Sequence, residues 1–182
     1  MSTKNSNFFS RDCMVQALIQ LLKTKSLSNI TITELTERAG VSRMTYYRNY
    51  HSLDEIFTSY LKDLVESYRQ DVATWPDKGN YNDSCNMLHC YEYFYHYKEF
   101  IACLVQTGMG HLLLQALDSY LLDTYYTEDK GRDFYYTLRA FSGSLYNIYV
   151  TWILEDSKES AEEIVSIICN IYSQDSLTES PK

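Results

Sequence analysis

Residues 30–57 read ITITELTERAGVSRMTYYRNYHSLDEIF, the most informative stretch of the chain. Thr31 stands three residues before Glu34, which is the spacing of a capping box, where both side chains bond to amides at the start of a helix. Gly40 follows at a place where a helix ends easily, because glycine adopts left-handed backbone without strain. The pattern therefore predicts a short helix over residues 32–39.

A second short helix follows the glycine. Ser42 is suited to cap it, since a serine hydroxyl accepts a hydrogen bond from an amide at the helix start. The helix is expected over residues 43–49, with Tyr46 and Tyr50 forming an inward stripe beside Val41. Two short helices joined by such a turn make a helix-turn-helix, whose second helix fits the major groove of DNA.

The remaining side chains of this second helix suit nucleic acid better than a protein core. Arginine matches the acceptors of guanine and asparagine matches adenine, which favours base contacts by Arg43, Arg48 and Asn49, with Thr45 as a further donor. Tyr47 can donate its phenolic proton to a phosphate. The start of the preceding helix, at Thr31, can hold a phosphate as well. A capped helical hairpin packed inside an ordinary bundle is the alternative.

Charge is distributed unevenly along the chain, which has a net charge of −8. Residues 1–52 contain seven basic and three acidic residues, which gives a net charge of +4. Residues 53–182 contain nine basic and twenty-one acidic residues, which gives −12. A basic head on an acidic body is typical of a protein that offers one face to a polyanion. Chance asymmetry is the alternative.

Turn-forming residues are scarce, with two prolines and six glycines among 182 residues. Strands need frequent turns, so this scarcity favours helices, and apolar residues recur at helical spacing through the rest of the chain. We therefore predict an all-α protein of about nine helices. Besides the two short helices, they are expected at residues 8–25, 53–75 (capped by Ser52 with Glu55), 83–96, 98–106, 109–126, 132–154 and 158–173.

The stretch quoted above resembles the DNA-binding signature of the TetR family of regulators, and the resemblance extends over residues 8–62. It implies that Thr31 and Tyr47 contact phosphate, while Tyr46 and Tyr50 hold the recognition helix on its core. By position it also implies a set of residues at the groove surface, namely Thr33, Arg43, Met44, Thr45, Arg48 and Asn49.

Two positions depart from the family pattern. Met44 stands where the family usually has a small residue or proline, and it can either touch a thymine methyl or only fill space. Leu53 stands where the family often has a lysine that contacts phosphate. His51 can partly replace that lysine when it is protonated. Loss of one phosphate contact lowers the salt dependence of binding by about one unit.

The last part of the chain also resembles this family. Residues 141–165, FSGSLYNIYVTWILEDSKESAEEIV, are similar to the last two helices of some TetR-family members, which pair two subunits. Gly143 would let the helices approach closely and Trp152 would anchor a homodimer interface. Ordinary packing within the subunit is the alternative. The expected organisation is a helix-turn-helix DNA-binding domain over residues 1–52 and a helical effector-binding and dimerisation domain over residues 53–182.

The middle of the chain is rich in aromatic residues, and the resemblance places a ligand cavity there. An apolar pocket with a few polar groups suits a small effector, and tyrosine is apolar with one hydrogen-bonding tip. An aromatic stripe that serves only as core is the alternative. The candidate effector-pocket residues are Tyr91, Phe94, Tyr95 and Phe100.

Metal, redox and catalytic roles have weaker support. Cys85 and His89 have a workable spacing for metal ligands on a helix, but no second pair completes a site, so no metal or other cofactor is expected. Redox sensing through Cys90 or Cys103 is a further alternative. No phosphate-binding loop or nucleophile motif occurs, which argues against an enzyme.

The function predicted from the sequence is a cytoplasmic transcription regulator. It is expected to bind double-stranded DNA as a homodimeric repressor and to leave a palindromic operator when a small-molecule effector binds. No membrane contact is expected, because no segment approaches the roughly 18 apolar residues of a span. The alternative is a TetR-like protein-interaction module that has lost sequence-specific DNA binding. Leu53 and the low pI of about 4.9 mildly favour that alternative.

Overall fold

The computed structural model describes residues 3–75 and 79–172, and these residues form helices joined by short connections. The α-helices are α1 (Thr3–Leu22), α2 (Ile32–Ala39), α3 (Arg43–Asn49), α4 (Asp54–Ala73), α5 (Ser84–Tyr95), α6 (Lys98–Gln106), α7 (Gly110–Tyr125), α8 (Gly131–Leu154) and α9 (Ala161–Tyr172). Two single 3₁₀ turns, Leu27–Asn29 and Glu128–Lys130, lie between them. The described residues contain no strand, so the all-α prediction is confirmed.

The bounds of α2 and α3 agree with the sequence-based prediction because local caps define them. Thr31 accepts a hydrogen bond from the Glu34 amide at 3.2 Å, and Ser42 accepts one from the Thr45 amide at 3.1 Å. Gly40 ends α2 in the left-handed conformation with φ of 66°. The Glu34 carboxylate bonds to Lys25 Nζ at 2.7 Å, and this bond together with the Thr31 amide lowers the pKa of Glu34.

The predicted bounds of the first and last helices are wrong by a few residues. Helix α1 begins earlier and ends at Leu22, and in the turn that follows the backbone amides of Thr24 and Lys25 both donate to the Leu21 carbonyl. Helix α9 starts at Ala161 because Ser160 and Glu163 form a reciprocal capping box, with bonds of 3.2 and 2.8 Å.

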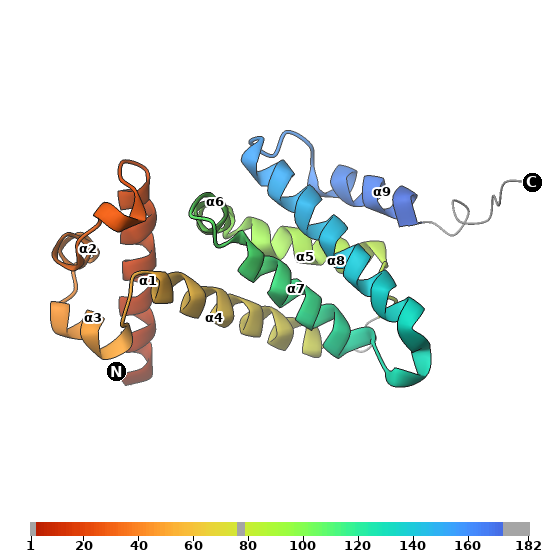
Figure 1. Ribbon diagram of the computed structural model, residues 1–182, viewed down its shortest axis with the longest axis horizontal. Helices are drawn as coiled ribbons and strands as arrows, with labels where there is room; N and C mark the ends of the chain where they lie inside the picture. Colours follow the sequence, from red (N-terminus) through yellow and green to blue (C-terminus); the bar gives the residue numbers. More distant parts are fainter. Residues whose placement is uncertain (1–2, 76–78, 173–182) are drawn as a thin grey trace, which may run out of the picture.

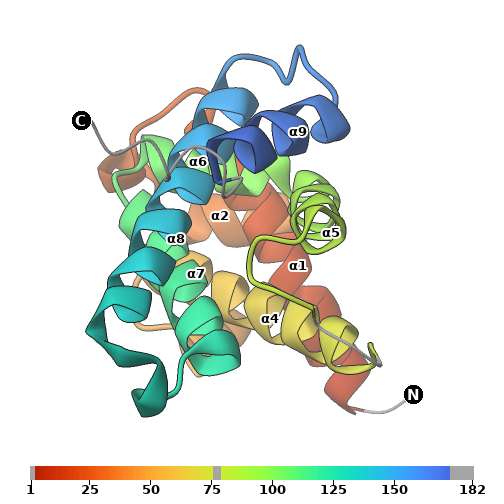
Figure 2. The same cartoon turned by 90° about the vertical axis from the view of Figure 1, so that its right-hand side faces the viewer.

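Helices α1 to α3 form a head at one end of the molecule, and α4 runs from this head along the body (Figure 1). In both views α9 lies on the side of the body opposite α4 (Figures 1 and 2). Helix α1 packs against α2, α4 and α6, and α7 packs between α4 and α8. Buried side chains from Met14 to Ile168 belong to a single hydrophobic cluster, so head and body share one core. The predicted domain boundary after residue 52 lies between α3 and α4 and stays a prediction.

The Arg11 side chain links the head to α4. Its guanidinium donates to Ser59 Oγ at 2.5 Å and pairs with Asp63 Oδ2 at 2.9 Å, both on α4. The same group donates to Tyr50 Oη at 3.3 Å, next to the end of α3. One side chain therefore ties together α1, the residue after the recognition helix and α4.

Within the described part of the chain, no single helix is both long and apolar enough to cross a membrane. One bent pair among the described helices, α6 with α7 at an angle of 119°, reaches the required length and hydropathy together.

Candidate nucleic-acid interface and interior cavity

Helix α3 has one buried and one exposed side. Tyr46 and Tyr50 are 1% and 3% exposed and their rings pack 5.9 Å apart, which fixes the helix on the head. Met44 is 75% exposed and Tyr47 is 59% exposed. A methionine so exposed on a short helix has its apolar surface in water, so it is available to an apolar group of a binding partner.

The polar residues of α3 differ in whether their side chains already form hydrogen bonds within the protein. Thr45 Oγ1 pairs with Ser42 Oγ at 2.9 Å, and Asn49 Nδ2 donates to the Thr45 carbonyl at 2.6 Å. Arg43 and Arg48 are exposed. The two arginines are therefore better placed than Thr45 or Asn49 to reach an external acceptor.

Helix α2 adds Thr31 and Thr33, which are exposed next to α3. Because the Thr31 oxygen accepts a bond from the Glu34 amide, its proton remains able to donate to a phosphate. Helix α2 carries Glu34 in its first turn and Arg38 in its last turn, so its own charges suit the helix dipole.

The start of α4 lacks a cation. Leu53 is half-buried and packs against the hydrophobic cluster, and Asp54 and Glu55 follow in the first turn. The expected cap at Ser52 is present, since its hydroxyl accepts from the Glu55 amide at 3.3 Å. Glu55 in turn accepts the backbone N–H of His51 at 2.7 Å. The His51 side chain is exposed at this helix start.

An interior cavity of about 50 Å³ lies among four helices of the body. Its wall is formed by side chains of α4, α5, α7 and α8, and none of them is charged. They are Val65, Tyr68, Cys90, Tyr91, Phe94, Leu113, Ala116, Leu117, Tyr120, Leu145, Tyr146 and Tyr149. Cavities that hold drug-sized ligands measure about 300–1,000 Å³, so this one is several times too small for such a ligand in its present arrangement.

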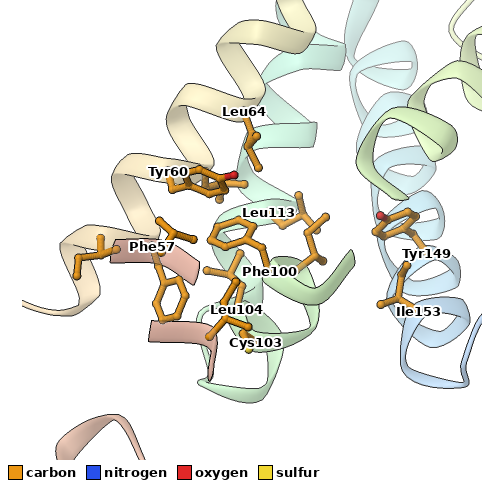
Figure 3. Packing of buried hydrophobic residues seen from close by; sticks show 14 of the residues in the cluster. Phe57, Tyr60, Leu64, Phe100, Cys103, Leu104, Leu113, Tyr149 and Ile153 are labelled. Atoms are coloured by element: carbon orange, nitrogen blue, oxygen red, sulfur yellow. The ribbon is translucent and has the colours of Figure 1, made fainter. Parts of the chain in front are cut away.

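Two of the four candidate pocket residues line this cavity and two lie elsewhere. Tyr91 and Phe94 are in its wall. Phe100 instead packs against Phe57 and Tyr60 of α4, with ring centroids 5.8 and 4.9 Å apart (Figure 3). Tyr95 lies against Trp152 at 5.1 Å, outside the cavity wall. Helical spacing identified aromatic residues but not the side of the helix that faces the cavity.

Sequence reasoning missed the tyrosines that α4, α7 and α8 contribute to the wall. Tyr149 is 6% exposed, and its hydroxyl is buried without a hydrogen-bond partner. Figure 3 shows its ring extending from α8, with the oxygen on the side of Leu113. A buried hydroxyl without a partner destabilises a fold by about 1–3 kcal/mol. No sequence signal marks it, because the missing bond depends on how four helices pack.

Gly143 and Trp152 occupy different environments on α8. Trp152 is 5% exposed, stacks near Tyr91 and donates its ring N–H to the Glu159 carbonyl at 2.9 Å. It lies inside the subunit, so the expectation that it anchors a dimer interface is corrected. Gly143 has open space where a Cβ would be, which leaves room for another helix.

The candidate metal and redox residues have other surroundings. His89 Nε2 lies 2.6 Å from Asp71 Oδ2, and its ring lies 4.7 Å from that of Trp75, while Cys85 is exposed. Among residues 3–75 and 79–172, no group of three or more potential ligands comes together. Desolvation raises the pKa of Cys90 to about 11 and also raises that of Cys103, which disfavours the reactive thiolate.

These features define a class of protein, a small helix-turn-helix head carried by a helical body with an interior cavity. Similar folds occur among solved structures. The fatty acid degradation regulator FadR from Bacillus halodurans matches with a TM-score of 0.61 at 14% identity, over 88% of this chain and 96% of that one. The dihydroxyacetone kinase operon activator DhaS matches at 0.59 with 17% identity, over 89% and 93%.

A TetR transcriptional regulator from Rhodococcus sp. RHA1 matches with a TM-score of 0.52 at 15% identity, over 92% of this chain and 96% of that one. The chain therefore has the fold of the TetR family of regulators, and the resemblance seen in the sequence is confirmed at the level of the fold.

One curated relative is similar in sequence. It is the uncharacterized HTH-type transcriptional regulator YxbF of Bacillus subtilis (strain 168), 26% identical over 167 residues. The match covers 87% of this chain and 43% of that protein, so the chain spans less than half the length of this relative. No family model matches the chain.

Thiol alkylation tests the surroundings of the cavity. At pH 8 we expect iodoacetamide to label Cys85 first and Cys90 at least tenfold more slowly, because a thiol with a pKa of about 11 is ionised in only about one molecule in a thousand. Labelling of Cys90 should then rise about tenfold per pH unit while the fold persists. Mass spectrometry of the peptides measures both rates, and Cys85→Ser is the control. Equal rates at pH 8 would show that Cys90 is not desolvated.

Proposed function

We propose that this protein is a homodimeric DNA-binding transcription repressor whose recognition helix is α3. The observation that carries the proposal is the two-sided character of α3. Tyr46 and Tyr50 fix it to the head, while Arg43, Tyr47 and Arg48 are exposed on its other side. Such a short helix, presented by a head of net charge +4, fits the major groove. The regulator names of the matched proteins also support the proposal and speak against catalysis.

The second subunit is proposed to pack on α8 and α9. Five exposed residues of α8 fall on one helical stripe, and the half-buried Gly143 lies in the middle of it at a spacing of three or four residues. The exposed members are Tyr136, Ala140, Asn147, Thr151 and Leu154. On α9, Ile167 and Ile171 are 50% and 54% exposed. Large apolar side chains exposed on adjacent helices are typical of a surface that a partner covers.

Dimerisation would set the spacing of the two heads. Two recognition helices about 34 Å apart enter successive major grooves on one side of the DNA, so the operator is expected to be an approximate palindrome. Repression requires only that the bound dimer cover a promoter, whereas activation also requires a surface that contacts the polymerase. A protein with this function is expected in the cytoplasm, together with its DNA.

Effector release is proposed to act through α4. Val65 and Tyr68 of α4 line the cavity, and Phe57 of the same helix is buried in the core next to the head. A ligand that widens the cavity would displace α4 and with it the head. The ligand would lower DNA affinity by no more than the ratio of its own affinities for the displaced and the undisplaced arrangement.

Enrichment of genomic DNA fragments by the purified protein, at low and high salt, tests the function. We expect a palindromic site that is lost at high salt, because phosphate contacts release counterions. Arg48→Ala should relax the preference at particular base pairs, by about 1–3 kcal/mol for a bidentate contact. Tyr47→Phe should instead weaken binding to every sequence alike. A folded dimer that enriches no fragment would favour the protein-interaction module.

Met44 is proposed to read a thymine methyl, which explains an apolar side chain at 75% exposure. Replacing single thymines of the operator by deoxyuridine removes only that methyl. At one position in each half-site we expect about fourfold weaker binding, the equivalent of about 0.8 kcal/mol for one buried methyl-sized group. Met44→Ala should bind both DNAs equally and serves as the matched control. Unchanged affinity at every thymine would assign Met44 a space-filling role.

The dimer surface is tested by Ile167→Asp, which introduces a charge at a half-exposed site. We expect a folded monomer, because the charge would be desolvated only in the interface. Operator affinity should fall at least tenfold, since two half-sites are no longer held by one particle. Gln115→Asp, on the exposed side of α7, is the control and should leave both properties unchanged. Light scattering and DNA titration measure the outcome; a dimer that persists would place the interface elsewhere.

A further inference from the structure

One of the tyrosine hydroxyls around the cavity is buried without a hydrogen-bond partner. The Tyr91 hydroxyl donates to the Leu145 carbonyl at 3.0 Å. The Tyr68 hydroxyl interacts with Cys90 and Tyr120. The Tyr149 hydroxyl, in contrast, is buried and lacks a partner, and it is the only side-chain nitrogen or oxygen atom in the described residues with this combination. It therefore marks one place in the wall where a bond is available.

The wall also restricts the charge of a ligand. None of its twelve residues is ionic, so a carboxylate or ammonium group would lose its water without gaining a counter-charge. Burial raises the pKa of Tyr91 and Tyr149 and raises that of Cys90 to about 11, so the wall stays neutral at physiological pH. Only an uncharged molecule matches these surroundings.

We propose that the cavity binds a small, uncharged, mainly apolar molecule with a single hydroxyl or carbonyl group, which bonds to Tyr149 Oη. At about 50 Å³ the cavity is about a third of the roughly 150 Å³ that admits benzene, so a molecule of one ring enters only if lining side chains shift outward. That this molecule is the effector rests on the proposed function. The inference adds the chemical class of the ligand and identifies Tyr149 as the residue that selects it.

Tyr149→Phe separates a ligand-binding hydroxyl from a structural one. If the Tyr149 hydroxyl stabilised the fold, its removal would lower the Tm. Because this hydroxyl has no partner, its removal should leave the Tm unchanged or raise it. Tyr60→Phe is the matched control, because it removes a hydroxyl that already donates to Asp12 and Tyr60 lies outside the cavity wall. We expect Tyr60→Phe to lower the Tm and to retain ligand selection.

The probes are phenol, toluene and benzoate, which share one ring and differ in hydrogen bonding and charge. With the full chain at pH 7.5 and no DNA, calorimetry should show phenol binding about tenfold more tightly than toluene, as one hydrogen bond to a buried partner provides. Benzoate should not bind. Tyr149→Phe should abolish the preference for phenol, while Tyr60→Phe should keep it.

Each contrary result has a distinct meaning. Absence of binding by both neutral probes, binding of benzoate as tight as that of phenol, or a phenol preference that survives Tyr149→Phe would overturn the inference. These measurements use no DNA, so they stand even if the protein binds no operator. An operator complex that is unaffected by bound phenol would overturn the effector role and leave the ligand class and the part of Tyr149 in place.

Discussion

Both halves of helix α4 are buried, the first beside the head and the second at the cavity. Its first half packs Ile56 and Phe57 into the core beside the head, and its second half supplies Val65 and Tyr68 to the cavity. With 20 residues it is about 30 Å long, and an intact helix transmits a displacement at one end to the other. The ion pair between Arg11 and Asp63 also joins α1 to α4. The head and the cavity are thus connected by the burial of one helix.

The head could be predicted from sequence because its determinants are local. Thr31, Gly40 and Ser42 each act on amides or carbonyls within four residues, so the bounds of α2 and α3 follow from the printed letters. The capping box of Ser160 and Glu163 is an equally local signal, and it locates the start of α9 better than hydrophobic periodicity does. Where a side chain bonds to its own helix, sequence suffices.

The cavity could not be predicted to the same degree, because α5 and α8 carry aromatic residues on several sides. Tyr91 and Tyr95 are one turn apart, yet Tyr91 lines the cavity and Tyr95 packs outside it on Trp152. Trp152 itself faces inward because the chain after α8 folds back, so that the Glu159 carbonyl receives its ring N–H. Such assignments depend on how helices distant in sequence cross, which periodicity does not encode.

Two unfavourable local features lie at the proposed DNA-binding and ligand-binding sites. Asp54 and Glu55 favour the start of α4 through the helix dipole, but with Leu53 they leave that end without a cation for phosphate. Under the proposed function, base and phosphate contacts would therefore depend more heavily on α3. The buried Tyr149 hydroxyl destabilises the unliganded body, and a bound molecule that accepts its proton would remove that cost. Departures from local consistency are expected where function is located, because selection for binding can outweigh selection for stability there.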